Sequence, residues 1–316
     1  MLVARAPTRL DFGGGWTDVP PYPEVRGGFV CNVAIDRLAT VILGDSSGPP
    51  GKSSDLVQAA LRRAERAGSA VPAPVSLSSD FPVGSGLGGS SAAGVALAAA
   101  LAVHRGEAVV HDADRGKLAE WSRAVEIEEL GIAGGRQDHY AAAYGGALAL
   151  TFGATTHVDR IPLADDCIVE LERRCVLAYT GESRISAATI TAVLDAYRDR
   201  NAVVVSALVR MAELAHAMHD ALATSDIDAL AATVDEHWMH QRSLHPGITT
   251  TRIDALEVAA RRAGAVGLKA LGASGGGCVI VFTPAHDDGA VAQAIAPFAS
   301  VMPWRVAHQG VTVTRV

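Results

Sequence analysis

The chain has 316 residues, of which 49% are hydrophobic and 19% charged, and its formal net charge is −7. This length favours about two domains, and the apolar fraction excludes an intrinsically disordered chain. Aromatic residues make up only 5% and no basic face is evident, which argues against nucleic acid as a partner. A nucleotide phosphate stays compatible with this charge, because backbone N–H groups bind it without net positive charge.

The cysteines and the apolar segments indicate the compartment. The four cysteines form no C-x-x-C pair, and we expect reduced, buried thiols. The longest uninterrupted run of apolar residues and glycine, 92–103, has 12 residues, whereas a membrane span needs about 20. The first seven residues do not have the pattern of a signal peptide. We therefore expect a cytoplasmic protein without a membrane partner.

The first 45 residues are typical of β structure. Short strands are predicted at 2–4 and 9–12, on either side of Pro7. Two apolar, β-branched runs at 28–35 and 38–43 flank a polar pair and predict a hairpin. Helical spacing then alternates with short strands: the helices are expected at 55–67, 91–104 and 114–130, and the strands at 75–78 and 145–152.

The second half is richer in helices. A polar stretch near 155–175 precedes it, and we place a domain boundary there, with domains at 1–165 and 166–316. Because strands come first and helices later in each half, the order favours an α+β fold. Helices are expected at 186–218, 226–243, 251–263 and 290–298, and strands at 176–180, 268–271, 278–282, 304–306 and 311–313.

A glycine-rich loop running into an alanine-rich helix is the most informative segment. Its glycines let a ligand approach the backbone, and the first N–H groups of the helix are unpaired, so together they predict a phosphate cradle. A dinucleotide fingerprint fits poorly, a Walker loop would need a lysine, and a structural turn stays an alternative. The candidate nucleotide-binding residues are Gly84, Ser85, Gly86, Leu87, Gly88, Gly89, Ser90 and Ser91.

Three blocks in this order resemble the motifs of the GHMP small-molecule kinases. They are A-P-T-R-L-D-F-G-G-G-W-T-D at 6–18, P-V-G-S-G-L-G-G-S-S at 82–91 and L-G-A-S-G-G-G-C at 271–278. Within that family, the G-G-W-T-D-V-P-P run at 14–21 and G-G-R-Q-D at 134–138 are most similar to D-glycero-D-manno-heptose 7-phosphate kinases and fucokinases. The resemblance implies a two-domain α+β architecture, with an N-terminal domain like ribosomal protein S5 domain 2 and a ferredoxin-like C-terminal domain.

The resemblance also implies ATP and Mg²⁺ as cofactors. Ser90 would supply a hydroxyl ligand for the metal, and a carboxylate would come from the helix before residue 138. The motif offset favours Glu126, while Glu128 and Glu129 stay open as candidates. For each of them the alternative is a solvated surface carboxylate.

Two charged residues are assigned to catalysis by the resemblance. Asp138 would be the base or orienting acceptor for the sugar hydroxyl, and Arg9 would keep that carboxylate ionised. The alternatives are a loop cap for Asp138 and a surface charge for Arg9. Asp18 would accept sugar hydroxyls and Trp16 would offer an apolar plate, although core packing is an equal reading of the indole. The other candidate substrate residues are Gly134, Gly135, Arg184, Gly275 and Gly276.

These assignments predict a kinase that transfers phosphate from ATP to the anomeric hydroxyl of a heptose 7-phosphate. L-fucose or another hexose is the alternative substrate, and a non-catalytic sensor of nucleotide and sugar is the alternative class. Ser274 replaces a glycine in the last block, and His237, His240 and His245 are read as structural or surface residues. We expect a monomer or a homodimer.

Overall fold

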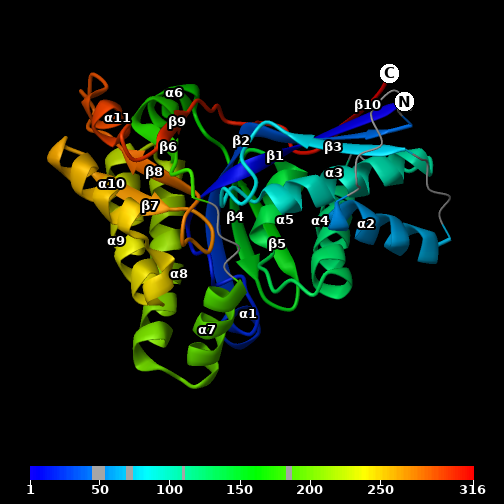
Figure 1. Ribbon diagram of the computed structural model, residues 1–316, viewed down its shortest axis with the longest axis horizontal. Coiled ribbons are helices and arrows are strands. Elements are labelled where there is room, and N and C mark those ends of the chain that lie inside the picture. The colour runs from blue at the N-terminus through cyan, green and yellow to red at the C-terminus, as the bar shows by residue number, and fades with distance from the viewer. Residues whose placement is uncertain (45–53, 69–73, 109–110, 183–186) are drawn as a thin grey trace.

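The protein is described by a computed structural model over residues 1–44, 54–68, 74–108, 111–182 and 187–316. Two antiparallel sheets carry the fold, each with helices packed against it (Figure 1). The N-terminal half contains the larger sheet, and the helix-rich half lies beside it around the smaller one. This is a two-domain α+β architecture, as the sequence predicts.

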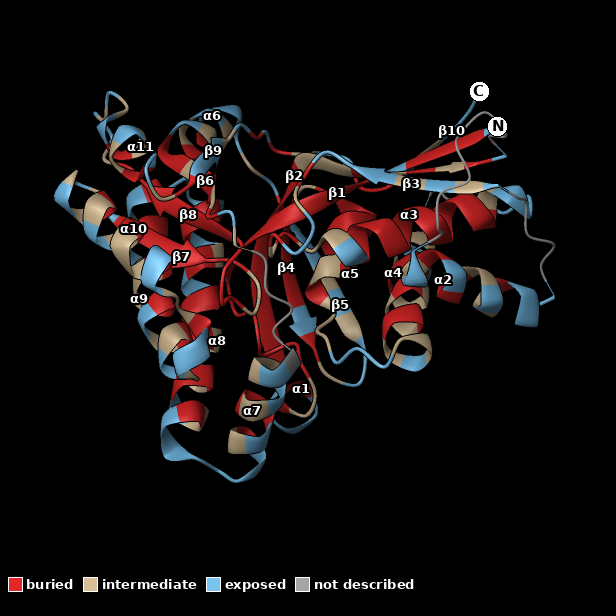
Figure 2. Cartoon of the chain, in the orientation of Figure 1, coloured by how far each residue is buried: buried red, intermediate tan, exposed pale blue. Residues whose placement is uncertain are grey.

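The larger sheet has six strands in the order β10-β1-β2-β4-β5, with β3 also paired to β2. Its helices other than α1 gather on one face, where the alanine-rich α3 is almost wholly buried because small side chains allow close approach (Figure 2). The strands are β1 (Leu2–Gly13), β2 (Gly28–Leu43), β3 (Val75–Ser79), β4 (Ala147–Phe152), β5 (Thr156–Ile161) and β10 (Thr312–Arg315). The helices are α1 (Tyr22–Arg26), α2 (Asp55–Arg66), α3 (Gly89–His104), α4 (Asp112–Ala124), the π-helix η1 (Val125–Glu129) and α5 (Gln137–Tyr144).

The expected hairpin in the first 45 residues is wrong. The two apolar runs form one continuous strand, β2, which pairs with an equally continuous β1 over residues 31–43. The polar pair at 36–37 lies where the register shifts between Pro7 and Thr8, so the irregularity is absorbed within the ladder without a turn. Long-range pairing thus overrides the local turn signal.

The smaller sheet has the order β7-β8-β6-β9. The single helix expected at 186–218 is two helices, because Arg200 adopts a positive φ and the side chain of Asn201 caps a new helix start. The strands are β6 (Cys175–Tyr179), β7 (Gly267–Ala270), β8 (Cys278–Phe282) and β9 (Ser300–Met302). The helices are α6 (Asp165–Arg174), α7 (Ala187–Arg198), α8 (Ala202–Ala223), α9 (Ile227–Ser243), the 3₁₀ helix η2 (Pro246–Ile248), α10 (Thr251–Arg262) and α11 (Ala290–Ile295).

The end of the chain returns to the first sheet. β10 pairs with β1, and the terminal ammonium group of Met1 donates to the carbonyl of Val316 at 3.0 Å. The strand expected at 304–306 is only an isolated bridge between Ile35 and Val306. The domain boundary at 165/166 stays a proposal. Residues 312–315 lie beyond that boundary in sequence, but they pair with β1 in the N-terminal sheet.

One described helix, α8, is long and apolar enough by composition to cross a membrane. In the fold it packs against α9 and β2, and Leu208, Met211 and Leu214 on its inner face are buried. A helix that packs in a protein core meets the same criteria of length and composition, so this one helix is weak evidence for a membrane span.

Candidate active site

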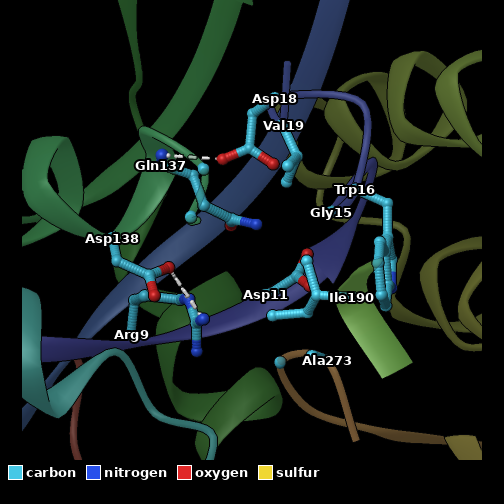
Figure 3. A pocket seen from close by; sticks show the side chains of 13 residues that line it. Arg9, Asp11, Gly15, Trp16, Asp18, Val19, Gln137, Asp138, Ile190 and Ala273 are labelled. Carbon is cyan, nitrogen blue, oxygen red and sulfur yellow. Dashed lines mark hydrogen bonds and ion pairs between the residues drawn. The ribbon is translucent and has the colours of Figure 1, made fainter. Parts of the chain in front are cut away.

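A pocket with several charged side chains lies where the two sheets meet, and it collects residues that are far apart in sequence (Figure 3). β1 and the loop after it, the turn before α5, α7 and the third glycine block all contribute to it. The lining residues are Arg9, Asp11, Gly15, Trp16, Asp18, Val19, Gly134, Gly135, Gln137, Asp138, Ile190, Gly272 and Ala273. Both residues assigned to catalysis are therefore in the pocket, with four of the seven assigned to substrate.

Arg9 and Asp138 form an ion pair at one side of the pocket. The Nε and Nη2 atoms of Arg9 lie 2.8 and 2.7 Å from Asp138 Oδ1, and the arginine side chain is only 3% exposed. The same guanidinium donates through Nη1 to the carbonyl of Gly86 at 2.6 Å. Arg9 is therefore buried, and the alternative of an exposed charge on a surface strand is wrong. Its guanidinium links the Asp138 carboxylate to the glycine loop.

The glycine loop ends against that carboxylate. Gly84, Gly86 and Gly88 all have positive φ, and α3 begins directly after Gly88. A Cβ on Gly88 would lie 2.9 Å from Asp138 Cγ, so a side chain there would collide with the carboxylate. The unpaired N–H groups at the start of α3 therefore open beside Asp138, where a bound phosphate would face the pocket.

The turn at 134–137 supports Asp18. The backbone N–H groups of Arg136 and Gln137 donate to Asp18 Oδ2 at 2.7 and 3.0 Å. A Cβ on Gly135 would lie 2.0 Å from that oxygen, which explains glycine at this position. Burial raises the pKa of Asp18 to about 6, and the charge of Asp138 adds to the rise against the opposing effect of the two N–H groups.

The loop after β1 presents Trp16 to the pocket. Trp16 has a φ of +78°, a strained conformation for a side chain of this size. The Thr17 hydroxyl donates to the Gly14 carbonyl at 2.6 Å, and buried His237 accepts the Gly14 N–H at 3.0 Å. Burial keeps the pKa of His237 well below its usual value, so the neutral ring anchors this loop. His237 is structural, as the sequence analysis expects.

Glu126 lies beside the start of α3. It is 8% exposed and hydrogen-bonded by the side chains of Ser90 and Ser91, and its Oε2 is 3.1 Å from Nε2 of His139. Burial raises the pKa of Glu126, but His139 and the two hydroxyls outweigh that effect and the net shift is downward. A charged carboxylate next to an exposed hydroxyl is the oxygen donor set that Mg²⁺ prefers, so these residues fit that metal.

The other two candidate carboxylates lie elsewhere. Glu128 and Glu129 pair with Arg63 on α2, and Glu129 also pairs with Arg66. The π-helix turns them towards that helix while Glu126 points to the glycine loop. Across the described ranges, no group of three or more His, Cys, Asp or Glu side chains is arranged to hold a metal ion. Protein ligands would therefore be few, as is usual for Mg²⁺ held with phosphates.

The third glycine block packs against the nucleotide loop. The Cys278 N–H donates to the Ser85 carbonyl at 2.7 Å, and a Cβ on Gly277 would lie 2.7 Å from the same oxygen. In this block Gly272 and Ala273 line the pocket, and Gly275 and Gly276 are outside its lining. Arg184 falls outside the described residues.

Sequence reasoning did not assign two residues that line the pocket, or the lysine that pairs with one of them. Asp11 and Gln137 line the pocket and are 2% and 6% exposed. Their Oδ1 and Oε1 atoms are buried and have no hydrogen-bond partner within the described part of the chain. Lys269, fully buried, pairs with Asp11 at 3.0 Å. The signal was present in the first block, where a charged residue sits two positions after Arg9 in an apolar strand.

Two family descriptions match the chain. Residues 55–146 match "GHMP kinases N terminal domain" and residues 218–302 match "GHMP kinases C terminal". The first range contains the glycine loop, Glu126 and Asp138, and the second contains Lys269 and the third glycine block.

Relatives of known activity extend the match over most of the chain. A bifunctional fucokinase/GDP-fucose pyrophosphorylase of Arabidopsis thaliana is 28% identical over 87% of this chain and 29% of its own length, so the chain spans less than a third of that protein. A D-glycero-alpha-D-manno-heptose 7-phosphate kinase of Campylobacter jejuni is 28% identical over 88% of both chains. A mevalonate kinase of Thermococcus onnurineus is 30% identical over 66% of this chain and 59% of its own.

Solved structures share the fold. The crystal structure of a D-glycero-D-manno-heptose 1-phosphate kinase from Bacteroides thetaiotaomicron superposes with a TM-score of 0.79 at 22% identity, covering 100% of this chain and 99% of the other. A galactokinase of Lactococcus lactis complexed with galactose superposes with a TM-score of 0.72 at 17% identity, over 98% and 95% of the two chains.

Proposed function

Because the chain belongs to the GHMP kinase family and is a phosphotransferase with an alcohol group as acceptor, we propose that it is an ATP- and Mg²⁺-dependent sugar kinase. Its reaction transfers the γ-phosphoryl group to the anomeric hydroxyl of D-glycero-D-manno-heptose 7-phosphate. The observation that carries this proposal is the position of Asp138, which lines the pocket and lies against Gly88 of the nucleotide loop.

The pocket is lined by hydrogen-bond acceptors, which supports a polyhydroxylated substrate. Asp11, Asp18 and Asp138 bring three carboxylates, and Gln137 adds an amide oxygen without a partner among the described residues. Acceptors need donors, and a sugar supplies one from each hydroxyl. A substrate that brings a carboxylate into this pocket, such as mevalonate, would be repelled by these aspartates. The lining therefore favours a sugar over such a substrate.

The nucleotide is assigned to the loop at 84–91. Its positive-φ glycines and the free N–H groups at the start of α3 would bind the phosphates of ATP. Ser90 and Glu126 would hold Mg²⁺, which when bound neutralises charge on the phosphate oxygens.

The proton transfer is assigned to Asp138. Its carboxylate accepts the hydrogen bond of the sugar hydroxyl and takes the proton as that oxygen forms its bond to the γ-phosphorus and the bond to ADP breaks. Arg9 orients Asp138 through two contacts below 3 Å, and its third donor contacts the carbonyl of Gly86 in the glycine loop. Positioning and charge together supply the rate enhancement expected for phosphoryl transfer.

L-fucose is the second candidate substrate, and two observations favour it. One relative is a fucokinase, and Arg9, already paired with Asp138, is the one cationic side chain among the described residues that line the pocket. A 7-phosphate would therefore have to reach beyond this lining, where Arg184 is its predicted partner.

The test is an ATP-consumption screen with purified protein over heptose 7-phosphate, L-fucose, D-mannose and D-galactose, with phosphorus NMR of the product. We expect turnover of heptose 7-phosphate with a new signal for an anomeric phosphate. Turnover of fucose alone would select the second candidate. A protein that binds ATP in a thermal shift assay but turns over none of these sugars would contradict the proposal and support the sensor.

A further inference from the structure

An ion pair joins the two halves of the molecule at the pocket, and its carboxylate, Asp11, is in the pocket lining. Asp11, on β1, is 2% exposed, and its Oδ2 lies 3.0 Å from Nζ of Lys269, on β7 of the other sheet. The second oxygen of the carboxylate, Oδ1, is buried without a hydrogen-bond partner in the described ranges. One carboxylate oxygen, Oδ2, therefore has a partner in the protein, and the other, Oδ1, has none among the described residues.

The ammonium group of Lys269 is surrounded by acceptors. Its side chain is fully buried, and Nζ contacts three acceptors: Asp11 Oδ2, the Asp11 carbonyl at 2.9 Å and the Phe12 carbonyl at 3.2 Å. An ammonium group has three hydrogens, so all of them are used. Burial lowers the pKa of Lys269, and the Asp11 carboxylate opposes that shift. A buried cation with no partner would be costly, so the pair is interdependent.

The backbone around Asp11 fixes where the carboxylate points. Asp11 pairs with Asn32 and Gly13 pairs with Cys31, so Phe12 is an extra residue in the ladder, and such bulges re-aim neighbouring side chains. The loop then returns over the carboxylate, since a Cβ on Gly15 would lie 2.5 Å from Asp11 Oδ2. Lysine on one side and the loop on the other hold Oδ2, and Oδ1 is the atom left for a ligand.

An unpartnered, buried carboxylate oxygen carries a free-energy penalty, which a ligand that donates a hydrogen bond would remove. The residue lines the same pocket as Asp18, Trp16 and Asp138 (Figure 3). An ionised carboxylate only accepts hydrogen bonds, so its ligand must be a donor, and the donor of a sugar is a hydroxyl.

We propose that Asp11 is a further substrate-binding residue, whose Oδ1 accepts a hydrogen bond from a hydroxyl of the sugar, and that Lys269 is the positioning residue that holds this carboxylate in place. The inference rests on the proposed function, because it takes the pocket to be the sugar site. It makes Asp11 a determinant of which hydroxyl pattern is accepted.

The test compares Asp11→Asn with the native protein on monodeoxy forms of the accepted sugar, each lacking one hydroxyl other than the anomeric one. In the native enzyme, loss of the recognised hydroxyl should lower kcat/KM by about 10- to 100-fold, the range for a hydrogen bond to a charged group. In Asp11→Asn that same analogue should cost no more than about twofold relative to the parent sugar, while the other analogues keep their penalties. The matched control is Asp159→Asn, an exposed carboxylate on β5, which should keep the native pattern.

A second pair of variants separates recognition from folding. Lys269→Met leaves the Asp11 charge without its cation, and we expect a lower melting temperature and a raised KM for the sugar with little change in KM for ATP. The double variant Asp11→Asn with Lys269→Met removes both charges and should regain most of the melting temperature without regaining discrimination among the deoxy sugars. Discrimination that returns with the melting temperature would assign the pair a structural role only.

Failure of this inference is distinguishable from failure of the proposed function. A native enzyme that phosphorylates none of the sugars tested contradicts the sugar kinase itself. An active enzyme in which Asp11→Asn keeps every native deoxy-sugar penalty contradicts only the role of Asp11.

Discussion

The proposed nucleotide loop and the proposed sugar pocket sit side by side but are built in different ways. The loop at 84–91 is one contiguous segment whose proposed function depends on main-chain N–H groups and on glycines with positive φ. The pocket gathers side chains from β1, the loop after it, the start of α5, α7 and the third glycine block. A site made of backbone can be recognised in one stretch of sequence, whereas a site made of side chains has to be assembled by the fold.

The two regions meet where Arg9 and Asp138 contact the glycine loop. Asp138 lines the pocket, pairs with Arg9 and lies under Gly88 of the loop. Each variant below changes the loop, the pocket or the contact between them. The expected loss of activity is largest for variants at that contact.

Asp138→Asn should have the largest effect, because it removes the proposed proton acceptor while keeping the side-chain shape. We expect kcat to fall by about 10³-fold, within the range for general base catalysis. Binding of a non-hydrolysable ATP analogue, followed by thermal shift, should be retained. Asp159→Asn is the control and should keep native kcat. Near-native turnover in Asp138→Asn would remove the base from the mechanism.

Gly88→Ala tests the contact between loop and pocket. The Cβ would lie 2.9 Å from Asp138 Cγ at a φ of +75°, so both the carboxylate and the loop must shift. We expect kcat to fall by about 10²-fold, as misplacement of about 1 Å does at a reacting centre. Gly106→Ala is the matched control, because it has a φ of +84° but open space around the Cβ.

Both glycine variants should lose a similar amount of stability, about 1 kcal/mol, from the backbone conformation alone. Only Gly88→Ala should lose turnover. Equal kcat in the two variants would show that the loop does not position Asp138.

The pH dependence of sugar use tests Asp18 in the pocket. Burial, with the charges of Asp138 and Asp11, raises its pKa to about 6. The ionised form is the acceptor, so it predominates above pH 6 and is lost as the pH falls through that value. We expect kcat/KM for the sugar to drop by roughly tenfold per pH unit below 6. Asp18→Asn should lower kcat/KM throughout and abolish this step, and a step that persists in Asp18→Asn would assign it to another group.

Ser90→Ala should have the smallest effect and confine it to the nucleotide side. Loss of one neutral hydroxyl ligand should raise the Mg²⁺ concentration for half-maximal rate about fivefold, which corresponds to about 1 kcal/mol. The KM for sugar should change little. Ser76→Ala, an exposed hydroxyl on β3, is the control. An unchanged Mg²⁺ titration in Ser90→Ala would contradict its role as a ligand.

The sequence by itself determined what depends on local chemistry. The glycine spacing at 84–89, the alanine-rich α3 and the G-G-x-Q-D block were readable because a backbone turn, a helix and a helix start each draw on neighbouring residues. The family and its α+β architecture followed from such blocks in order. The local signals were misleading where pairing partners lie far away: β1 and β2 run straight through segments that predicted breaks.

Tertiary structure alone decided which side chains share the pocket. Arg9 meets Asp138 from 129 positions away, and Lys269 reaches the Asp11 carbonyl across 258 positions. It also separated Glu126 from Glu128 and Glu129, whose sequence positions left the choice open. Such contacts depend on how two sheets pack and on which charges burial forces together, and neither is encoded in the spacing of any one segment.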